Sequence, residues 1–179
     1  MVANIPAKMS LGLKNPDATA VVALGSNMAG DYGSSETLLE VALTRFAAAG
    51  LPILRRSSWW RSAAWPDPSS DEYRNGVVLV EARQPPEALI QTLFMLEDEF
   101  GRTRGARNAS RTLDLDLIAH GRIVSDDPAL TLPHPRAHER FFVMGPLAEI
   151  APDWRHPVLG KTAAELARLA PVGRDARPV

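Results

Sequence analysis

Apolar and polar residues recur along the chain with two spacings, and these predict alternating strands and helices. Short apolar runs, such as residues 18–24 and 77–80, are typical of buried strands. Apolar residues three and four positions apart over residues 36–49 and 85–100 predict two helices with one apolar face each. Ser34 or Ser35 is suited to cap the first helix, and Pro85-Pro86 to open the second.

The whole pattern predicts one α+β domain. We expect the strands at residues 18–24, 53–62, 73–81, 113–118 and 123–124, and the helices at 36–49, 85–100, 141–150 and 162–169. The order β-α-β-β-α-β predicts a ferredoxin-like fold, an antiparallel sheet with helices packed on it and extra C-terminal elements. We expect a single domain at residues 18–170, between flexible tails at residues 1–17 and 171–179.

The most informative strand carries two carboxylates on one face. Leucines at 113, 115 and 117 alternate with Asp114 and Asp116, which is the period of a strand. The leucines should face a core and the carboxylates the opposite side, with neighbouring carboxylates on residues roughly 6–7 Å apart. Mg²⁺ prefers oxygen ligands and is commonly held by one or two carboxylates together with substrate phosphates. The alternative is a solvated polar face of an exposed strand.

Arginines gather just before this strand. Arg102, Arg104, Arg107 and Arg111 lie in a glycine-containing segment that follows the second helix. A guanidinium stays charged and matches the geometry of phosphate oxygens. Cations beside carboxylates predict a polyphosphate site, whereas the alternative is a set of solvated loop arginines that form surface ion pairs.

Charge and cysteine content exclude several function classes. The formal net charge is −1, which does not indicate general attraction to nucleic acids or anionic membranes. The chain has no cysteine, so disulfides, thiolate zinc sites, iron–sulfur clusters and a cysteine nucleophile are all excluded. No apolar run approaches the roughly 20 residues of a membrane span, and the N-terminus does not resemble a secretory signal. We therefore expect a cytoplasmic protein.

Two further groups of residues suggest ligand contacts. Tyr73 and Asn75 share one strand face, where an amide can read the edge of a heterocycle; Trp65, in a proline-rich loop, offers a ring for stacking. His134 and His138 have the spacing of two zinc ligands on a helix, but Pro135 lies between them. A role for His134 and Arg140 toward phosphates fits better than zinc.

Taken together, these segments resemble the 6-hydroxymethyl-7,8-dihydropterin pyrophosphokinase family of folate biosynthesis. The resemblance spans about residues 19 to 166, and its most specific parts are the Arg-Thr-Leu-Asp-Leu-Asp run at 111–116, Leu-Pro-His at 132–134 and Arg-x-Phe at 140–142. Further matching segments lie at 23–27, 58–62, 73–76, 97–104 and 143–152.

The resemblance implies a transfer of pyrophosphate from ATP to the hydroxymethyl group of the pterin, with release of AMP. By resemblance, Asp114 and Asp116 hold two Mg²⁺ ions, and Arg102 and Arg111 act in catalysis beside them. The implied ATP contacts are Glu97, Arg104, Arg111, Leu117, Thr131, His134 and Arg140. The pterin site comprises Ser62, Trp65, Tyr73, Asn75 and Phe142, with Tyr73 and Phe142 as the rings that sandwich the pterin.

The chain departs from the family pattern at three places. Asn108-Ala109-Ser110 replaces the usual Trp-Gly-Pro in a loop one residue shorter, residues 62–64 replace a Thr-Pro-Pro run, and Pro135 replaces an aromatic residue. None of these changes removes an aspartate or a pterin ring, so we expect an active enzyme.

Two other functions compete with this interpretation. A pterin or nucleotide sensor of the same fold that has lost catalysis would carry the same residues. A nucleic-acid binder would need a ribonucleoprotein pattern of aromatic residues, which is absent. We expect ATP and the pterin as the partners, with neither nucleic acid nor membrane; the oligomeric state stays open, a monomer being one possibility.

Overall fold

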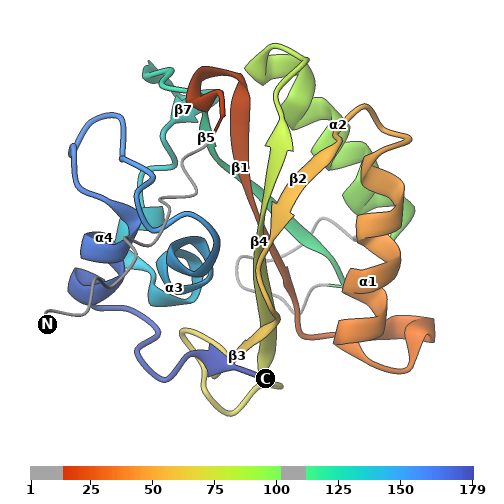
Figure 1. The fold of residues 1–179 in the computed structure, drawn as a ribbon. Coiled ribbons are helices and arrows are strands. Elements are labelled where there is room, and N and C mark those ends of the chain that lie inside the picture. Colours follow the sequence, from red (N-terminus) through yellow and green to blue (C-terminus); the bar gives the residue numbers. More distant parts are fainter. Residues whose placement is uncertain (1–13, 102–111) are drawn as a thin grey trace, which may run out of the picture.

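The computed structural model describes residues 14–101 and 112–179. A central antiparallel sheet lies between two helical layers, with α1 and α2 on one side and α3 and α4 on the other (Figure 1). The helices are α1 (Ser35–Phe46), α2 (Pro86–Glu99), α3 (Phe141–Ile150) and α4 (Ala163–Leu169), with 3-10 turns η1 (Pro16–Ala18), η2 (Gly30–Tyr32) and η3 (Ala137–Glu139).

The main sheet runs in the order β5-β1-β4-β3-β8, and β2 also pairs with β4. Its strands are β1 (Thr19–Ser26), β2 (Ile53–Arg56), β3 (Trp60–Ser62), β4 (Tyr73–Glu81), β5 (Asp114–His120) and β8 (Arg177–Pro178). A separate hairpin joins β6 (Ser125–Asp127) to β7 (Leu130–Leu132). The central order, with the two crossover helices on one face, confirms the predicted ferredoxin-like α+β fold.

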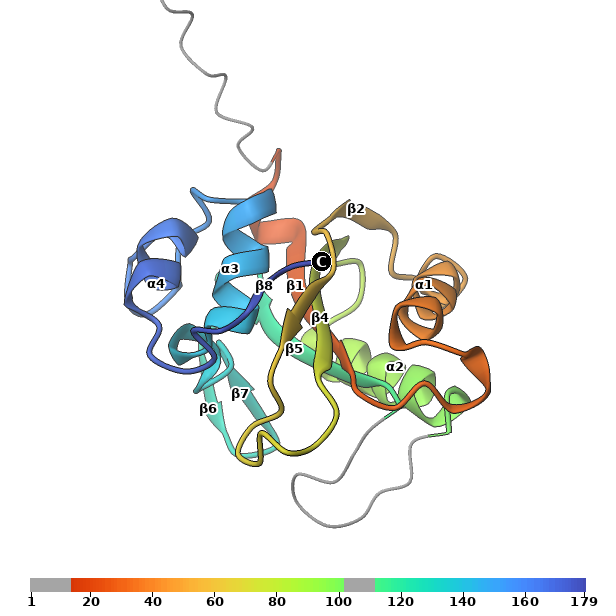
Figure 2. The same cartoon turned by 90° about the horizontal axis from the view of Figure 1, so that it is seen from below.

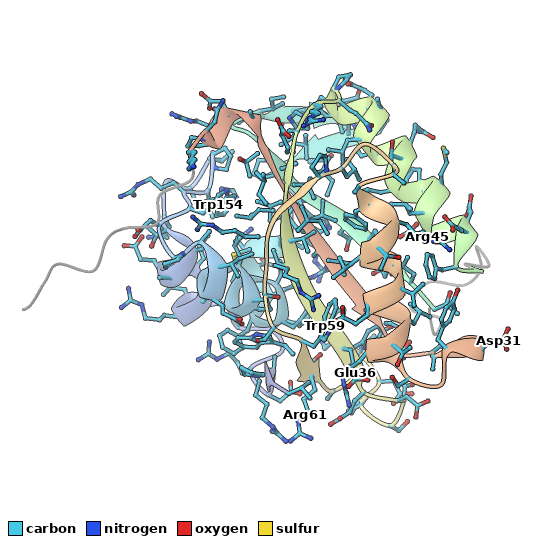
Figure 3. The ribbon with its side chains drawn as sticks, turned by 45° about the vertical axis from the view of Figure 1, so that its right-hand side comes forward. Asp31, Glu36, Arg45, Trp59, Arg61 and Trp154 are labelled. Carbon is cyan, nitrogen blue, oxygen red and sulfur yellow. The ribbon has the colours of Figure 1, made fainter. Side chains whose placement is uncertain are left out.

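The two faces of the sheet have separate cores. The face toward α1 and α2 buries Val22 and Leu24 of β1 together with the alternate leucines of β5. The face toward α3 and α4 buries Val21, Val77 and Leu147, among other residues. Figure 3 shows Trp59 and Trp154 on the two sides, each packed against the core of its own layer. Side chains of neighbouring residues along β1 alternate between these two cores, so this strand is buried on both faces.

Local sequence signals set the ends of the helices. Ser34 accepts a hydrogen bond from the backbone N–H of Thr37 at 3.1 Å and so caps α1. Thr162 and Glu165 form a reciprocal capping box at the start of α4. Among residues 14–101 and 112–179, no helix has the length and apolarity needed to cross a membrane.

The structure differs from the predicted elements in two strand regions. The single strand expected over residues 53–62 is divided into β2 and β3. The break lies at Ser57, whose hydroxyl, in place of a backbone carbonyl, accepts the backbone N–H of Val77 in β4 at 3.0 Å. The short strand expected at residues 123–124 lies slightly later and forms the β6–β7 hairpin.

The C-terminal residues differ most from expectation. Residues 171–179 were expected to form a flexible tail, but they include β8, which pairs with β3 beside the end of the chain (Figure 1). Val179 donates its backbone N–H to the carbonyl of Trp59 at 2.9 Å. At the other end, residues 1–13 of the expected N-terminal tail lie outside the described residues.

Candidate active site

A cavity of about 280 Å³ opens at one end of the sheet, on the face covered by α3. The strands are antiparallel, so the last residues of β1 and β3 lie beside the first residues of β4 and β5 at this end of the sheet. The cavity is lined by Ala23, Leu24, Gly25, Ser62, Ala63, Trp65, Tyr73, Asn75, Asp114, Asp116, His134, Arg140, Phe142 and Val143. Nine of the predicted site residues therefore meet in one place, although they come from segments as distant as 62 and 142.

The floor of the cavity is set by strand register. Gly25 of β1 pairs with Asn75 on one side and with Asp114 on the other. Ala23 pairs with Asp116 in the same way. Because these two β1 residues are small, they leave open space between the amide and the two carboxylates.

Aromatic side chains line the cavity above this floor. A Cβ atom on Gly25 would lie 3.8 Å from Cδ1 of Tyr73, so this ring stands beside the floor. Phe142 reaches the cavity from the first turn of α3. Trp65 is 52% exposed, and the Cζ atom of Arg136 lies 5.7 Å from its ring centre. The cavity thus offers flat apolar surfaces suited to a planar ligand.

A buried polar pair, Ser62 and Asn75, also lines the cavity. Asn75 is 7% exposed and donates its side-chain N–H to the hydroxyl of Ser62 at 2.9 Å. The bond fixes the rotation of the amide and directs its carbonyl oxygen elsewhere in the cavity; this oxygen lies 3.7 Å from the Cβ position of Gly25. A fixed amide in an apolar surrounding gives orientation to a ligand that can hydrogen-bond along one edge.

His134 is held as a neutral imidazole near the carboxylates. Its backbone N–H donates to the carbonyl of Ile118 in β5 at 2.8 Å, which ties the segment to the edge strand. Burial, followed by the positive charge of Arg140, lowers the pKa of His134 to about 4, although Asp114 acts in the opposite direction. Nδ1 of the ring accepts the backbone N–H of Arg136 at 3.2 Å, so the neutral ring carries its proton on Nε2 as a donor.

The two aspartates form an oxygen donor set for a hard cation. Asp114 and Asp116 lie on the cavity face of β5, whereas Leu115 between them is 4% exposed and belongs to the opposite core. No group of three or more histidine, aspartate or glutamate side chains suited to a metal occurs in residues 14–101 and 112–179. Two carboxylates fit Mg²⁺, which commonly takes its other ligands from water and substrate phosphates.

Three residues that the resemblance assigns to ATP do not line the cavity. Glu97 is 1% exposed in α2, and its carboxylate accepts the backbone N–H of Leu115 at 2.7 Å. It therefore supports β5 between the two aspartates, from the opposite face. Leu117 is buried in the core beneath α1 and α2, and Thr131 is exposed on the β6–β7 hairpin (Figure 2).

Three predicted arginines, Arg102, Arg104 and Arg111, lie outside the part of the chain that the structure describes, so their roles stay predictions. The zinc alternative gains no support from His138, because its ring lies beside that of His156, with centres 5.7 Å apart, while His134 faces the cavity.

Sequence reasoning missed the small residues of the cavity. Ala23, Gly25, Ala63 and Val143 were not predicted as site residues, yet they line the cavity. The sequence indicated the positions of two of them, but not their role in the cavity. Ala23 and Gly25 end the first apolar run, beside strands whose register the sequence does not specify.

Comparison with known proteins assigns the family. The family model of 7,8-dihydro-6-hydroxymethylpterin-pyrophosphokinase (HPPK) matches residues 21–152. A 2-amino-4-hydroxy-6-hydroxymethyldihydropteridine pyrophosphokinase of Synechocystis sp. is 45% identical over 148 residues, which are 82% of this chain and 73% of that protein. The protein of the same name from Methylorubrum extorquens is 35% identical over 156 residues, 86% of this chain and 95% of its own length.

Solved structures agree at the level of the fold. The structure of wild-type Plasmodium falciparum HPPK-DHPS matches with a TM-score of 0.62 and 14% identity over 84% of this chain. This chain spans 44% of the length of that larger protein. The match to the family model over most of the chain, together with relatives up to 45% identical, shows that the chain belongs to the HPPK family.

Proposed function

We propose that this chain catalyses the Mg²⁺-dependent transfer of pyrophosphate from ATP to the hydroxymethyl group of 6-hydroxymethyl-7,8-dihydropterin. The products are AMP and the pterin diphosphate, an intermediate of folate biosynthesis. One observation carries the proposal: aromatic walls with a fixed amide and a pair of carboxylates open onto the same cavity.

The size and lining of the cavity favour the pterin as its occupant. A volume of about 280 Å³ is near the lower end of the roughly 300–1,000 Å³ typical of ligand sites, so it suits one small heterocycle. In the proposed complex, the pterin stacks between Tyr73 and Phe142, and Asn75 reads its edge. The hydroxymethyl group then points toward Asp114 and Asp116, where the phosphates of ATP would approach.

The chemical step is a displacement at phosphorus. The hydroxymethyl oxygen loses its proton to solvent and forms a bond to the β-phosphorus of ATP. The bond from that phosphorus to the oxygen bridging it to the α-phosphate breaks, and AMP leaves with that oxygen. Such transfers depend on positioning and electrostatic stabilisation and need no covalent nucleophile. Arg140 and His134 both line the cavity, and in the proposed complex the Arg140 guanidinium and the Nε2 proton of His134 would donate to phosphate oxygens.

Asp114 and Asp116 are the residues that would hold Mg²⁺. When bound, two such ions neutralise phosphate charge and align the reacting oxygens. The protein contributes the placement of both carboxylates on one strand face and the support of that strand by Glu97 from behind.

The test is a direct assay of the reaction. Purified protein incubated with ATP, Mg²⁺ and 6-hydroxymethyl-7,8-dihydropterin should release AMP and pterin diphosphate in equal amounts, as measured by mass spectrometry. Chelation by EDTA should stop the reaction, and excess Mg²⁺ should restore it. Pterin binding without AMP formation would instead identify the catalytically inactive sensor.

A substrate control separates binding from transfer. A dihydropterin that lacks the hydroxymethyl group should compete for the site but give no pterin diphosphate. If it supports AMP release at the same rate, the proposed acceptor is wrong.

A further inference from the structure

The C-terminal segment contacts both sides of the cavity. We name residues 172–179 the strap; it lies beyond the part of the chain that matches the family model. Its first residue, Val172, donates its backbone N–H to Glu139 at 3.0 Å and accepts that of Phe141 at 2.8 Å. Near its end, Arg177 and Pro178 pair with β3. Ala176, which precedes this pair, is 6% exposed. The strap is therefore fixed at both ends and runs from the start of α3 to the edge of the sheet (Figure 2).

Near its beginning the strap supports one wall of the cavity. Gly173 has a φ of +71°, and a Cβ atom there would lie 2.4 Å from Cδ1 of Phe142. Glycine is needed both for the backbone conformation and for the close approach of this backbone to the ring. Phe142 also lines the cavity, so the strap backbone lies against a ring that forms part of the cavity wall.

Near its middle the strap holds the opposite wall. The carboxylate of Asp175 accepts the backbone N–H of Ala63 at 2.6 Å. Ala63 lines the cavity and begins the loop that carries Trp65. A hydrogen bond to a carboxylate is shorter and stronger than one between neutral groups, which makes it a suitable anchor for a loop.

Arg174, between these two contacts, fixes the strap to the helical layer. Its guanidinium donates to the carbonyl of Ala167 in α4 at 2.9 Å, and its Cζ atom lies 4.5 Å from the ring centre of Phe141. Gly173 and Asp175 therefore contact opposite walls of the cavity, and Arg174 between them is bound to α4 and to Phe141.

From these contacts we propose that the strap sets the width of the pterin slot, with Asp175 and Gly173 as positioning residues for the pterin. This inference rests on the proposed function of the cavity. A planar heterocycle gains most from stacking when both walls are already at the right separation, because no binding energy is then spent on ordering them. A change at either strap contact, by loss of the Asp175 hydrogen bond or by a clash with Phe142 at position 173, should weaken pterin binding while leaving ATP binding unchanged.

The first test removes the loop anchor. Asp175→Ala should raise the KM for the pterin about 3- to 10-fold, because a hydrogen bond to a charged group is lost. The KM for ATP should stay constant. Asp175→Asn keeps an acceptor oxygen for Ala63 and should restore most of the pterin affinity. Equal changes in both KM values, or no recovery with asparagine, would overturn the positioning role.

The second test uses two glycines with the same backbone strain. Gly160 has a φ of +67° and no atom within 4 Å of a Cβ position, so Gly160→Ala is strained without any clash. Gly173→Ala adds the contact with Phe142 and should raise the dissociation constant of the pterin, measured by calorimetry, above that of Gly160→Ala. Equal constants for the two variants would contradict the proposal.

These tests remain separate from the test of the proposed function. If the unmodified protein forms no AMP from ATP and the pterin, the function is wrong. If it forms AMP but the strap variants bind the pterin as it does, only the role of the strap is wrong. Should Gly173→Ala fail to fold, the Asp175 variants decide, because the Asp175 side-chain contact is exposed.

Discussion

The two faces of β5 use the same strand for different purposes. On one face, Leu113, Leu115 and Leu117 join a closed core beneath α1 and α2. On the other, Asp114 and Asp116 line a cavity that is bounded in part by the first turn of α3. The alternation of the strand therefore separates residues that hold the fold from residues that face the ligand, at positions that are adjacent in sequence. This separation predicts that neighbouring substitutions affect different properties.

The largest effect is expected on the open face. Asp114→Ala and Asp116→Ala should each lower kcat by about 10³-fold, because a carboxylate that holds a catalytic metal contributes several kcal/mol to the rate. The melting temperature should change little, since neither side chain belongs to a core. Steady-state assays and calorimetry test this pair of results; unchanged turnover in either variant would refute the metal assignment.

The closed face should give the opposite pattern. Leu115→Ala removes a side chain that is 4% exposed and should lower the free energy of unfolding by about 2–5 kcal/mol. The rate per folded molecule should be retained well below the melting temperature. Urea unfolding and activity measured on the same sample test this, and a large loss of kcat in the folded protein would show that the two faces are not independent.

Removal of an aromatic ring from the cavity wall should weaken the binding of the pterin and leave that of ATP unchanged. Phe142→Ala should raise the KM for the pterin about 5- to 100-fold, as expected for the loss of one stacking ring on a heterocycle. Phe142→Tyr retains the ring and serves as the control. A comparable rise in the KM for ATP would argue against a pterin-specific wall.

The smallest effect concerns protonation on the open face. The pKa of His134 is about 4 in the folded protein against an ordinary 6.5, because of burial and the nearby Arg140. Between these values only the unfolded chain binds the proton, so the contribution to stability is complete above pH 6.5 and falls as the pH drops toward 4. His134→Gln should show a shallower loss of stability over this range.

Denaturation curves at several pH values measure this difference. NMR titration of the ring should also show His134 neutral at pH 6. Parallel stability curves for the two proteins, or a titration near 6.5, would contradict the lowered pKa of the half-buried imidazole.

Periodicity predicted the parts of the fold whose burial repeats along the chain. The alternation at residues 113–117 and the helical spacing of α1 were sufficient, because one buried face imposes its period on the sequence. The break at Ser57 was not predictable in this way, since a side chain there replaces a strand partner. The ordered conformation of the strap could not be predicted from the sequence either. It depends on contacts such as that of Asp175 with Ala63, which are 112 residues apart.

The candidate site shows the same division. The carboxylate pair followed from a local pattern, and the resemblance supplied the rings and His134 as members of one site. The small residues Ala23 and Gly25 could not be predicted, because their importance comes from pairing with Asp116, Asp114 and Asn75 across the sheet. Glu97 was assigned to ATP by resemblance, whereas the structure gives it a contact with the backbone of β5.

The most direct test of the central claim is a crystal structure of the protein with Mg²⁺, a non-hydrolysable ATP analogue and the pterin. We predict the pterin ring between Tyr73 and Phe142, its edge at Asn75, and the phosphates beside Asp114 and Asp116. A pterin bound elsewhere, or phosphates remote from both aspartates, would contradict the division of the start of β5 into a buried structural face and a face that binds the ligands.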